Sequence, residues 1–88
     1  MALAKYANRR DKNEKRIIET LEGVGATVVQ LNEVDLLCGF RGQNWLLEVK
    51  SEKGKMRQSQ IDFREMWQGQ YAVVWNEDDA LRAIGRID

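Results

Sequence analysis

The first apolar pattern along the chain has helical spacing and predicts a helix over residues 11–24. Ile17 and Leu21 lie one turn apart on the same face, and Gly25 is suited to following the helix end. Glu14 precedes Ile17 by three residues, so it continues the face that points toward the interior. A partly solvated helix end would explain Glu14 equally well.

Three short strands are predicted next, at residues 27–31, 35–40 and 44–50. The dipeptide Arg41-Gly42 separates the last two strands and is suited to a two-residue hairpin turn. Phe40 would then face Gln43. This pair sets the register of every residue farther along both strands.

The second half of the sequence predicts a helix, a strand and a last helix. Helical spacing extends over residues 59–68, with Gln60 near the start. The apolar side of this helix is expected to carry Phe63, Met66 and Trp67. Residues 71–75 form an uninterrupted apolar run, which is typical of a strand covered on both faces. Asn76 is suited to capping the last helix, with Gly85 beyond its end.

The element order α-β-β-β-α-β-α predicts an α/β fold, in one domain that spans residues 1–88. The first three strands would form a meander. A crossover helix would then bring the fourth strand parallel to the third, which completes a mixed four-stranded sheet flanked by helices. Residues 1–10 are expected to form a basic N-terminal arm.

The composition excludes several kinds of chemistry. No apolar run has the length of a signal peptide core or a membrane span, so no membrane association is expected. The single cysteine, Cys38, excludes an intrachain disulfide and fits a reducing, cytoplasmic compartment. The chain has no histidine, which excludes His-based catalysis and His-ligated metal sites. A carboxylate and lysine site remains, with a hard divalent cation as its natural cofactor.

Positive charge is concentrated in two segments, although the formal net charge is zero. The segments run from Lys5 to Arg16 and from Lys50 to Arg57. Both are suited to contacts with a DNA backbone, although solvated surface charge is the stronger explanation when charge is considered alone. The candidate DNA-binding residues are Arg9, Arg10, Lys12, Lys15, Lys53, Lys55 and Arg57.

The hairpin register brings charged residues together on one face of the sheet. Counting outward from the turn places Asp35 directly opposite Glu48. Lys50 points to the same face as Glu48, because side chains alternate along a strand. The other face receives the apolar residues Leu36, Cys38, Phe40, Trp45, Leu47 and Val49.

Two carboxylates that face each other repel, so this arrangement predicts a cation between Asp35 and Glu48. Lys50 is one candidate. Mg²⁺ is the better one, because it accepts one or two carboxylates, keeps several waters and binds phosphate oxygens. The backbone carbonyl of Val49 is a further candidate ligand. A structural salt bridge among the same residues is the alternative.

Six motifs occur in order over residues 9–85: Asn13-Glu14, Val34-Asp35-Leu36-Leu37, Leu47-Glu48-Val49-Lys50-Ser51, Gln60, Tyr71-Ala72-Val73-Val74-Trp75 and Asp79-Ala80-Leu81. This ordered set resembles the VRR-NUC (virus-type replication-repair nuclease) family of the PD-(D/E)XK nuclease superfamily, in its minimal phage-like form. The resemblance implies a restriction-endonuclease-like αβββαβα core. Val34 stands where the family usually has proline, which bears on the register near Asp35 and not on the ligands.

The resemblance also implies a role for each candidate catalytic residue. Asp35 and Glu48 would be the main metal-binding carboxylates, and Glu14 would complete the metal site or act through its water. Lys50 would orient or deprotonate the attacking water and stabilise the charged transition state. Gln60 would position Lys50 or the nucleophile.

The implied activity is Mg²⁺-dependent hydrolysis of DNA by a structure-specific endonuclease in a phage or bacterial host cytosol, with Mn²⁺ as a substitute metal. Minimal nucleases of this group act as homodimers on branched DNA such as Holliday junctions. The alternatives are a nuclease for flaps, nicks or RNA, and a non-catalytic nucleic-acid-binding accessory domain. The tryptophans are expected in the core more than at a dimer interface. They are Trp45, Trp67 and Trp75.

Overall fold

The computed structural model describes residues 12–31, 35–50 and 58–88. Within these ranges the helices are α1 (Lys12–Gly23), α2 (Gln58–Met66) and α3 (Glu77–Ala83). The strands are β1 (Thr27–Gln30), β2 (Leu36–Phe40), β3 (Gln43–Val49) and β4 (Tyr71–Val74). The predicted α/β fold with the order αβββαβα is confirmed. The predicted arm at residues 1–10 and the substituted proline position, Val34, lie outside the described residues.

The four strands form one mixed sheet in the order β1-β2-β3-β4. The first two pairs are antiparallel, and β4 runs parallel to β3, as predicted. Arg41 and Gly42 have positive φ angles of 52° and 79°, which a type I′ hairpin turn requires. Phe40 pairs with Gln43, so the predicted register of the hairpin is confirmed.

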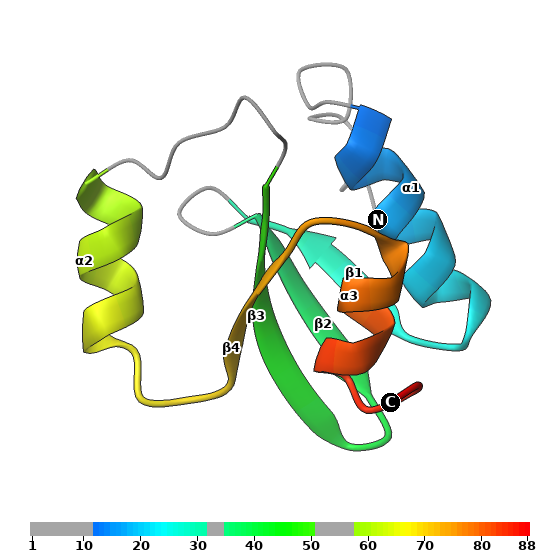
Figure 1. Ribbon diagram of the computed structural model, residues 1–88. Helices are drawn as coiled ribbons and strands as arrows, with labels where there is room; N and C mark the ends of the chain where they lie inside the picture. Colours follow the sequence, from blue (N-terminus) through cyan, green and yellow to red (C-terminus); the bar gives the residue numbers. More distant parts are fainter. Residues whose placement is uncertain (1–11, 32–34, 51–57) are drawn as a thin grey trace.

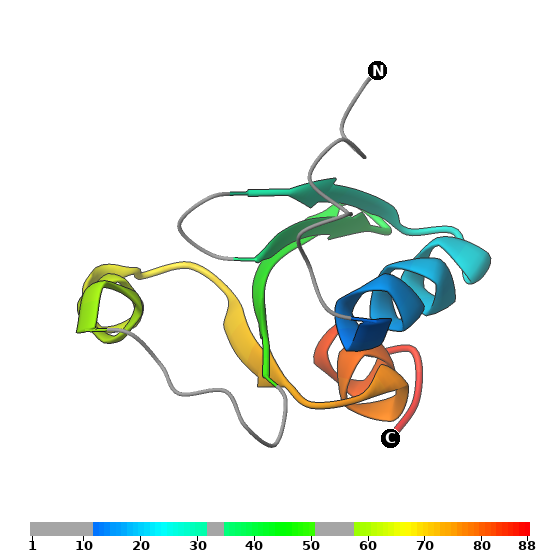
Figure 2. The ribbon, with the colours of Figure 1, turned by 90° about the horizontal axis from the view of Figure 1, so that it is seen from above.

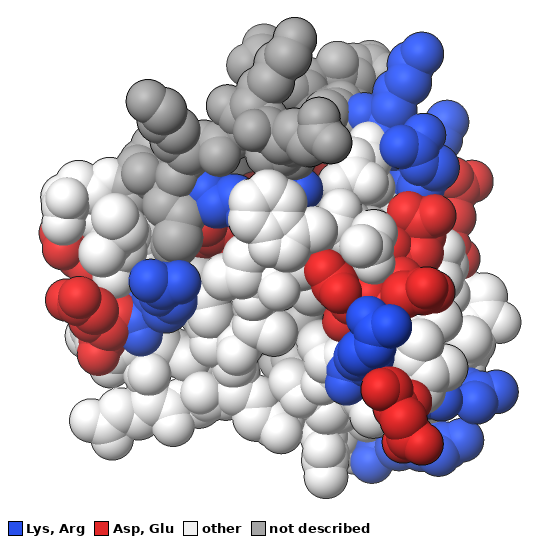
Figure 3. All heavy atoms as spheres, viewed as in Figure 1, with Lys and Arg blue, Asp and Glu red and all other residues white. Residues whose placement is uncertain are grey.

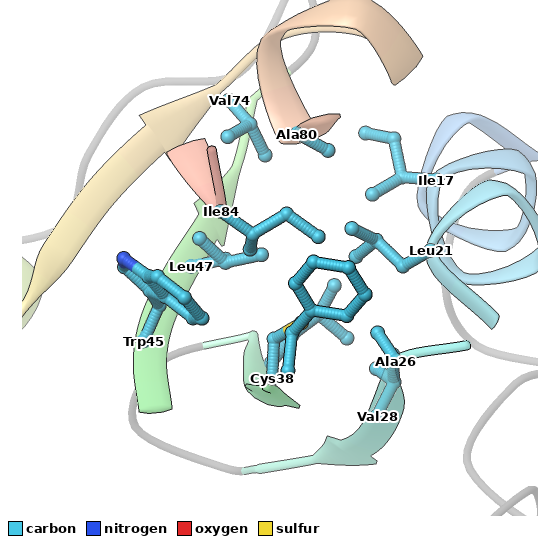
Figure 4. Close-up of a cluster of buried hydrophobic side chains, with 12 residues drawn as sticks. Ile17, Leu21, Ala26, Val28, Cys38, Trp45, Leu47, Val74, Ala80 and Ile84 are labelled. Carbon is cyan, nitrogen blue, oxygen red and sulfur yellow. The ribbon is translucent and has the colours of Figure 1, made fainter. Parts of the chain in front are cut away.

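Helices α1 and α3 cover one face of the sheet, and the main hydrophobic core lies between them and the strands (Figures 1, 2 and 4). The core residues are Ile17, Leu21, Ala26, Val28, Leu36, Cys38, Phe40, Trp45, Leu47, Val74, Ala80 and Ile84. Val49 packs against this cluster. The apolar face predicted for the hairpin is therefore confirmed.

The predicted cap of the last helix is present. The side chain of Asn76 accepts a hydrogen bond from the backbone N–H of Asp79 at 2.8 Å, which satisfies a donor in the first turn of α3. Gly85 follows the helix with a φ of 78°. In the described ranges, none of the helices has the length and apolar character that crossing a bilayer requires.

Helix α2 lies on the opposite side of the sheet from α1 and α3 (Figure 2). Its predicted apolar side is not buried, since Met66 is 61% and Trp67 41% exposed. The rings of Trp67 and Phe63 stack on each other, with centroids 5.6 Å apart, and do not pack into the core. Three of the four residues of β4 are only partly buried, whereas the apolar run predicted a strand covered on both faces. Trp75 is also exposed, so the expectation of core tryptophans holds for Trp45 alone.

Candidate active site

The candidate acidic residues meet where β2 begins and β3 ends. Asp35 directly precedes β2, and Glu48 is the penultimate residue of β3. The Asp35 carboxylate accepts a hydrogen bond from the backbone N–H of Val49 at 2.8 Å, through Oδ2. The Asp35 side chain therefore reaches the end of β3, where the hairpin register places it.

Glu48 is fully buried, and its two carboxylate oxygens have different surroundings. Oε1 accepts a hydrogen bond from the Tyr71 hydroxyl at 2.7 Å. Oε2 lies 3.5 Å from Nζ of Lys50, and no hydrogen-bond donor among the described residues reaches it. A buried oxygen without a donor is costly, so Oε2 is an acceptor that a bound cation would satisfy.

Lys50 is buried and held through its backbone. Its N–H donates to the carbonyl of Val74 at 2.9 Å. Its carbonyl accepts a hydrogen bond from Nδ2 of Asn13 at 3.1 Å, and the same amide donates to the carbonyl of Trp75 at 3.0 Å. The beginning of α1 thus joins the ends of β3 and β4, and it fixes the point from which the Lys50 side chain extends.

Glu14 and Gln60 are both buried, which agrees with side chains that face the interior and not with partly solvated helix ends. Glu14 lies in the first turn of α1, and Gln60 lies near the start of α2. Figure 2 shows these two helices on opposite sides of the sheet. Burial agrees with a role inside the fold, while the assignment of either residue to a metal ion or a nucleophile stays a prediction.

Tyr71 belongs to this cluster, although the sequence did not single out its hydroxyl. Burial, the hydrogen bond to Glu48 and the negative charges of Glu48 and Asp35 raise the pKa of Tyr71 well above its ordinary value. The positive charge of Arg64 on α2 lowers this pKa, but its effect is smaller than the sum of those that raise it. The hydroxyl therefore keeps its proton at neutral pH and serves as a donor. Both carboxylates act on this one group, which is evidence that they share one region.

Part of the predicted DNA-binding surface is visible. Lys12 and Lys15 are exposed on α1. Figure 3 shows Lys and Arg side chains around the beginning of α1 and a concentration of acidic side chains over α3. The remaining candidates lie outside the described residues: Arg9, Arg10, Lys53, Lys55 and Arg57.

An open hollow of about 290 Å³ lies farther along the sheet, toward the segment that follows α2. Its lining contains no charged side chain, so it offers little to a phosphate group or a metal ion. The lining residues are Leu37, Asn44, Trp45, Leu46, Trp67, Gly69 and Gln70.

Comparison with solved structures identifies a domain of the same architecture. A structure described as "VRR_NUC domain" has a TM-score of 0.69 and 25% sequence identity to this chain, and the match covers 88% of this chain and 95% of that chain. The chain has a VRR-NUC-like fold. No family model matches the sequence, and no curated protein does. The resemblance inferred from the ordered motifs is confirmed by this structural match, and with it the PD-(D/E)XK nuclease-like fold.

The VRR-NUC-like domain has donors that fit a divalent metal, which PD-(D/E)XK-like folds typically use. Over the described ranges, no three Asp, Glu or Cys side chains are grouped as a ready-made metal site. Mg²⁺ needs only one or two carboxylates, with water in its other positions. The unsatisfied Oε2 of Glu48 meets that need, and Asp35 lies at the same end of the sheet. The Val49 carbonyl points to the same strand edge as its N–H, which faces Asp35.

Proposed function

We propose that the VRR-NUC-like domain is a Mg²⁺-dependent, structure-specific DNA endonuclease that hydrolyses phosphodiester bonds. The observation that carries the proposal is the state of Glu48. It is a fully buried carboxylate with Oε1 bound by Tyr71 and Oε2 beside Lys50 without a hydrogen bond. A fold gains no stability from such an acceptor, and a metal site explains it.

Asp35 and Glu48 would hold the metal, with the Val49 carbonyl and Glu14 as further ligands. Bound Mg²⁺ would supply Lewis acidity that polarises a phosphate oxygen and acidifies a water molecule. Mn²⁺ prefers the same oxygen ligands and is expected to substitute for it. Both metals prefer oxygen ligands, which agrees with a site made of carboxylates rather than thiols or imidazoles.

Lys50 would act on the attacking water and on the charge that develops on the phosphate. Its backbone is fixed on both sides, and its buried ammonium group is drawn toward Oε2 of Glu48, so it is preorganised for that role. Gln60 would position Lys50 or the nucleophile from α2.

The proposed substrate is branched duplex DNA such as a Holliday junction, and the proposed active form is a homodimer. Backbone phosphates would contact the basic residues around α1 and in the segment between β3 and α2, which position a duplex without reading its sequence. A symmetric dimer would present two equivalent sites and cut two strands. The proposed setting is the cytosol of a bacterial host.

A cleavage assay tests the proposal. The full chain is incubated with a four-way junction and with a linear duplex of matched sequence, in Mg²⁺ and in EDTA. The junction should be cut in Mg²⁺ and remain intact in EDTA, and Glu48→Gln should lose cleavage by several orders of magnitude while still binding DNA. The matched control is Glu19→Gln, the same chemical change at an exposed position of α1, which should cut normally.

Other outcomes identify the alternatives. Preferred cutting of flaps or nicked duplex would replace the junction as substrate. DNA binding without cleavage in any divalent metal would indicate a non-catalytic accessory domain. If Mg²⁺ also fails to raise the melting temperature, Glu48 and Lys50 form a structural ion pair and the endonuclease proposal is wrong.

A further inference from the structure

We infer that Tyr71 is a positioning residue of the metal site: its hydroxyl holds Oε1 of Glu48, so that Oε2 is the oxygen presented to the metal. This inference rests on the proposed function, since it assigns Tyr71 to the same site. The hydrogen bond of 2.7 Å between the Tyr71 hydroxyl and Oε1 is the observation that carries it.

The register between β3 and β4 explains how Tyr71 reaches Glu48. Leu46 pairs with Tyr71, and Glu48 pairs with Val73. Tyr71 is therefore the diagonal neighbour of Glu48 on the same face of the sheet, at a distance that an aromatic side chain can bridge. Phenylalanine at this position would reach the same place without offering a donor.

The hydroxyl distinguishes the two oxygens of a carboxylate that is otherwise symmetric. Glu48 is fully buried, and the ammonium group of Lys50 lies 3.5 Å from Oε2. Without the hydroxyl, Glu48 could rotate and offer both oxygens to Lys50. The Tyr71 hydrogen bond keeps Oε1 occupied and leaves Oε2 directed to the site, as outer-shell partners do for ligating carboxylates.

The Tyr71 ring is itself supported from α2. The Phe63 ring lies 6.3 Å from it at an angle of 40°, and Phe63 in turn stacks on Trp67. This packing fixes the direction of the hydroxyl. Phe63 on α2 is thereby linked to Glu48 through the Tyr71 ring and its hydroxyl.

The test compares Tyr71→Phe with the unchanged chain by calorimetric titration of Mg²⁺, at a temperature where circular dichroism shows both proteins folded. Tyr71→Phe should raise the Kd for Mg²⁺ by roughly 10- to 100-fold. Cleavage should need correspondingly more Mg²⁺ and recover nearly full kcat at saturation. A purely structural role would lower the melting temperature and leave the Kd unchanged.

The control is Phe63→Leu, which loosens the ring packing and keeps the hydroxyl. It should lower the melting temperature with a smaller effect on the Kd than Tyr71→Phe. An equal loss in both variants would overturn the inference, because ring packing would then be responsible. Unchanged Mg²⁺ binding by Tyr71→Phe, with normal binding and cleavage by the parent chain, overturns the inference alone. A parent chain that neither binds Mg²⁺ nor cuts DNA overturns the proposed function as well.

Discussion

At the residue scale, burial makes the charges of Glu48 and Lys50 depend on each other. Their side chains are 0% and 8% exposed, and their nearest charged atoms are 3.5 Å apart. A buried ion pair is seldom more stabilising than an apolar pair of the same volume, but loss of one partner leaves an uncompensated charge. The pair is therefore expected to contribute more to the chemistry of the site than to the stability of the fold.

Lys50→Met tests this dependence. The variant keeps most of the length of the side chain and removes the charge, so Glu48 loses its ion-pair partner. The free energy of unfolding in EDTA should fall by about 3 kcal/mol. Urea denaturation measures the change. The double variant Glu48→Gln/Lys50→Met should be more stable than Lys50→Met alone, since it leaves no charge behind. A Lys50→Met chain as stable as the parent would show that the two charges are not coupled.

Cys38 leads to a pH-dependent prediction. Burial raises the pKa of its thiol from 9.0 to about 11. The unfolded chain loses this proton near pH 9, whereas the folded chain keeps it, so this contribution to stability is complete below pH 9 and is lost between pH 9 and 11. Cys38→Ala lacks the titrating group. Its deficit in unfolding free energy, measured with urea, should therefore narrow as the pH rises from 8 to 10.

The comparison between the two chains isolates the thiol, because every other titrating group is present in both. The Tyr71 hydroxyl, whose pKa burial also raises, is among these shared groups, so its contribution cancels from the comparison. A deficit of Cys38→Ala that remains constant across this range would contradict the raised pKa.

At the element scale, one amide joins three elements. Asn13 at the beginning of α1 donates to two carbonyls that lie just beyond the ends of β3 and β4. The carbonyls belong to Lys50 and Trp75. The orientation of α1 and the position of the Lys50 backbone are consequently linked, although they are far apart in the sequence.

Asn13→Ala should disturb both stability and activity. Loss of two hydrogen bonds should lower the free energy of unfolding by about 1–3 kcal/mol. It also releases the Lys50 carbonyl, so the cleavage rate should fall even under conditions where the variant remains folded. Asn76→Ala is the control. It removes the cap of α3 at a cost of about 1 kcal/mol and leaves the Lys50 carbonyl bonded. Equal cleavage rates for the two folded variants would contradict a link between Asn13 and the site.

The elements that the sequence predicted well are those determined by local chemistry. The turn at Arg41-Gly42 determines the β2–β3 register, and the position of Asp35 opposite the end of β3 follows from it. The parallel register of β3 and β4 depends on a crossover through α2, for which no local turn provides a rule. The hydrogen bond from Tyr71 to Glu48 depends on that register, which is why the sequence did not reveal it.

Helix α2 shows a second limit of prediction. Phe63, Met66 and Trp67 have helical spacing, which indicates a helix with an apolar side but not what covers that side. In the structure Phe63 and Trp67 stack on each other and Met66 is exposed. Gln60 is buried near the start of the same helix, whereas spacing alone left a partly solvated helix end as an equal alternative.

At the scale of the whole molecule, the core and the pair formed by Glu48 and Tyr71 lie on different faces of the sheet. The core lies between the sheet and the pair α1 and α3 (Figures 2 and 4). Glu48 and Tyr71 alternate along their strands with the core residues Leu47 and Val74, so they face the other side of the sheet. Substitutions on that second face do not remove core volume. Glu48→Gln and Tyr71→Phe are therefore expected to alter the site without loss of the fold.

The proposed homodimer predicts the outcome of mixing active and inactive chains. Each chain carries one Glu48, so a dimer of the parent chain with Glu48→Gln has one working site. On a supercoiled plasmid with a cruciform, the parent dimer should make paired cuts and yield linear DNA. Mixed dimers should cut one strand and yield nicked circles, in a proportion set by random pairing of the two chains.

Sedimentation would first establish whether the mass in solution is twice the 10.2 kDa of one chain. Mixing with Glu19→Gln, which retains its site, should produce linear DNA only. If the chain is a monomer and inactive chains merely dilute the activity, the ratio of nicked to linear product will not depend on the mixture. The two cuts would then be independent events, and the proposed coordination across a two-fold axis would be wrong even if each site uses the same carboxylates.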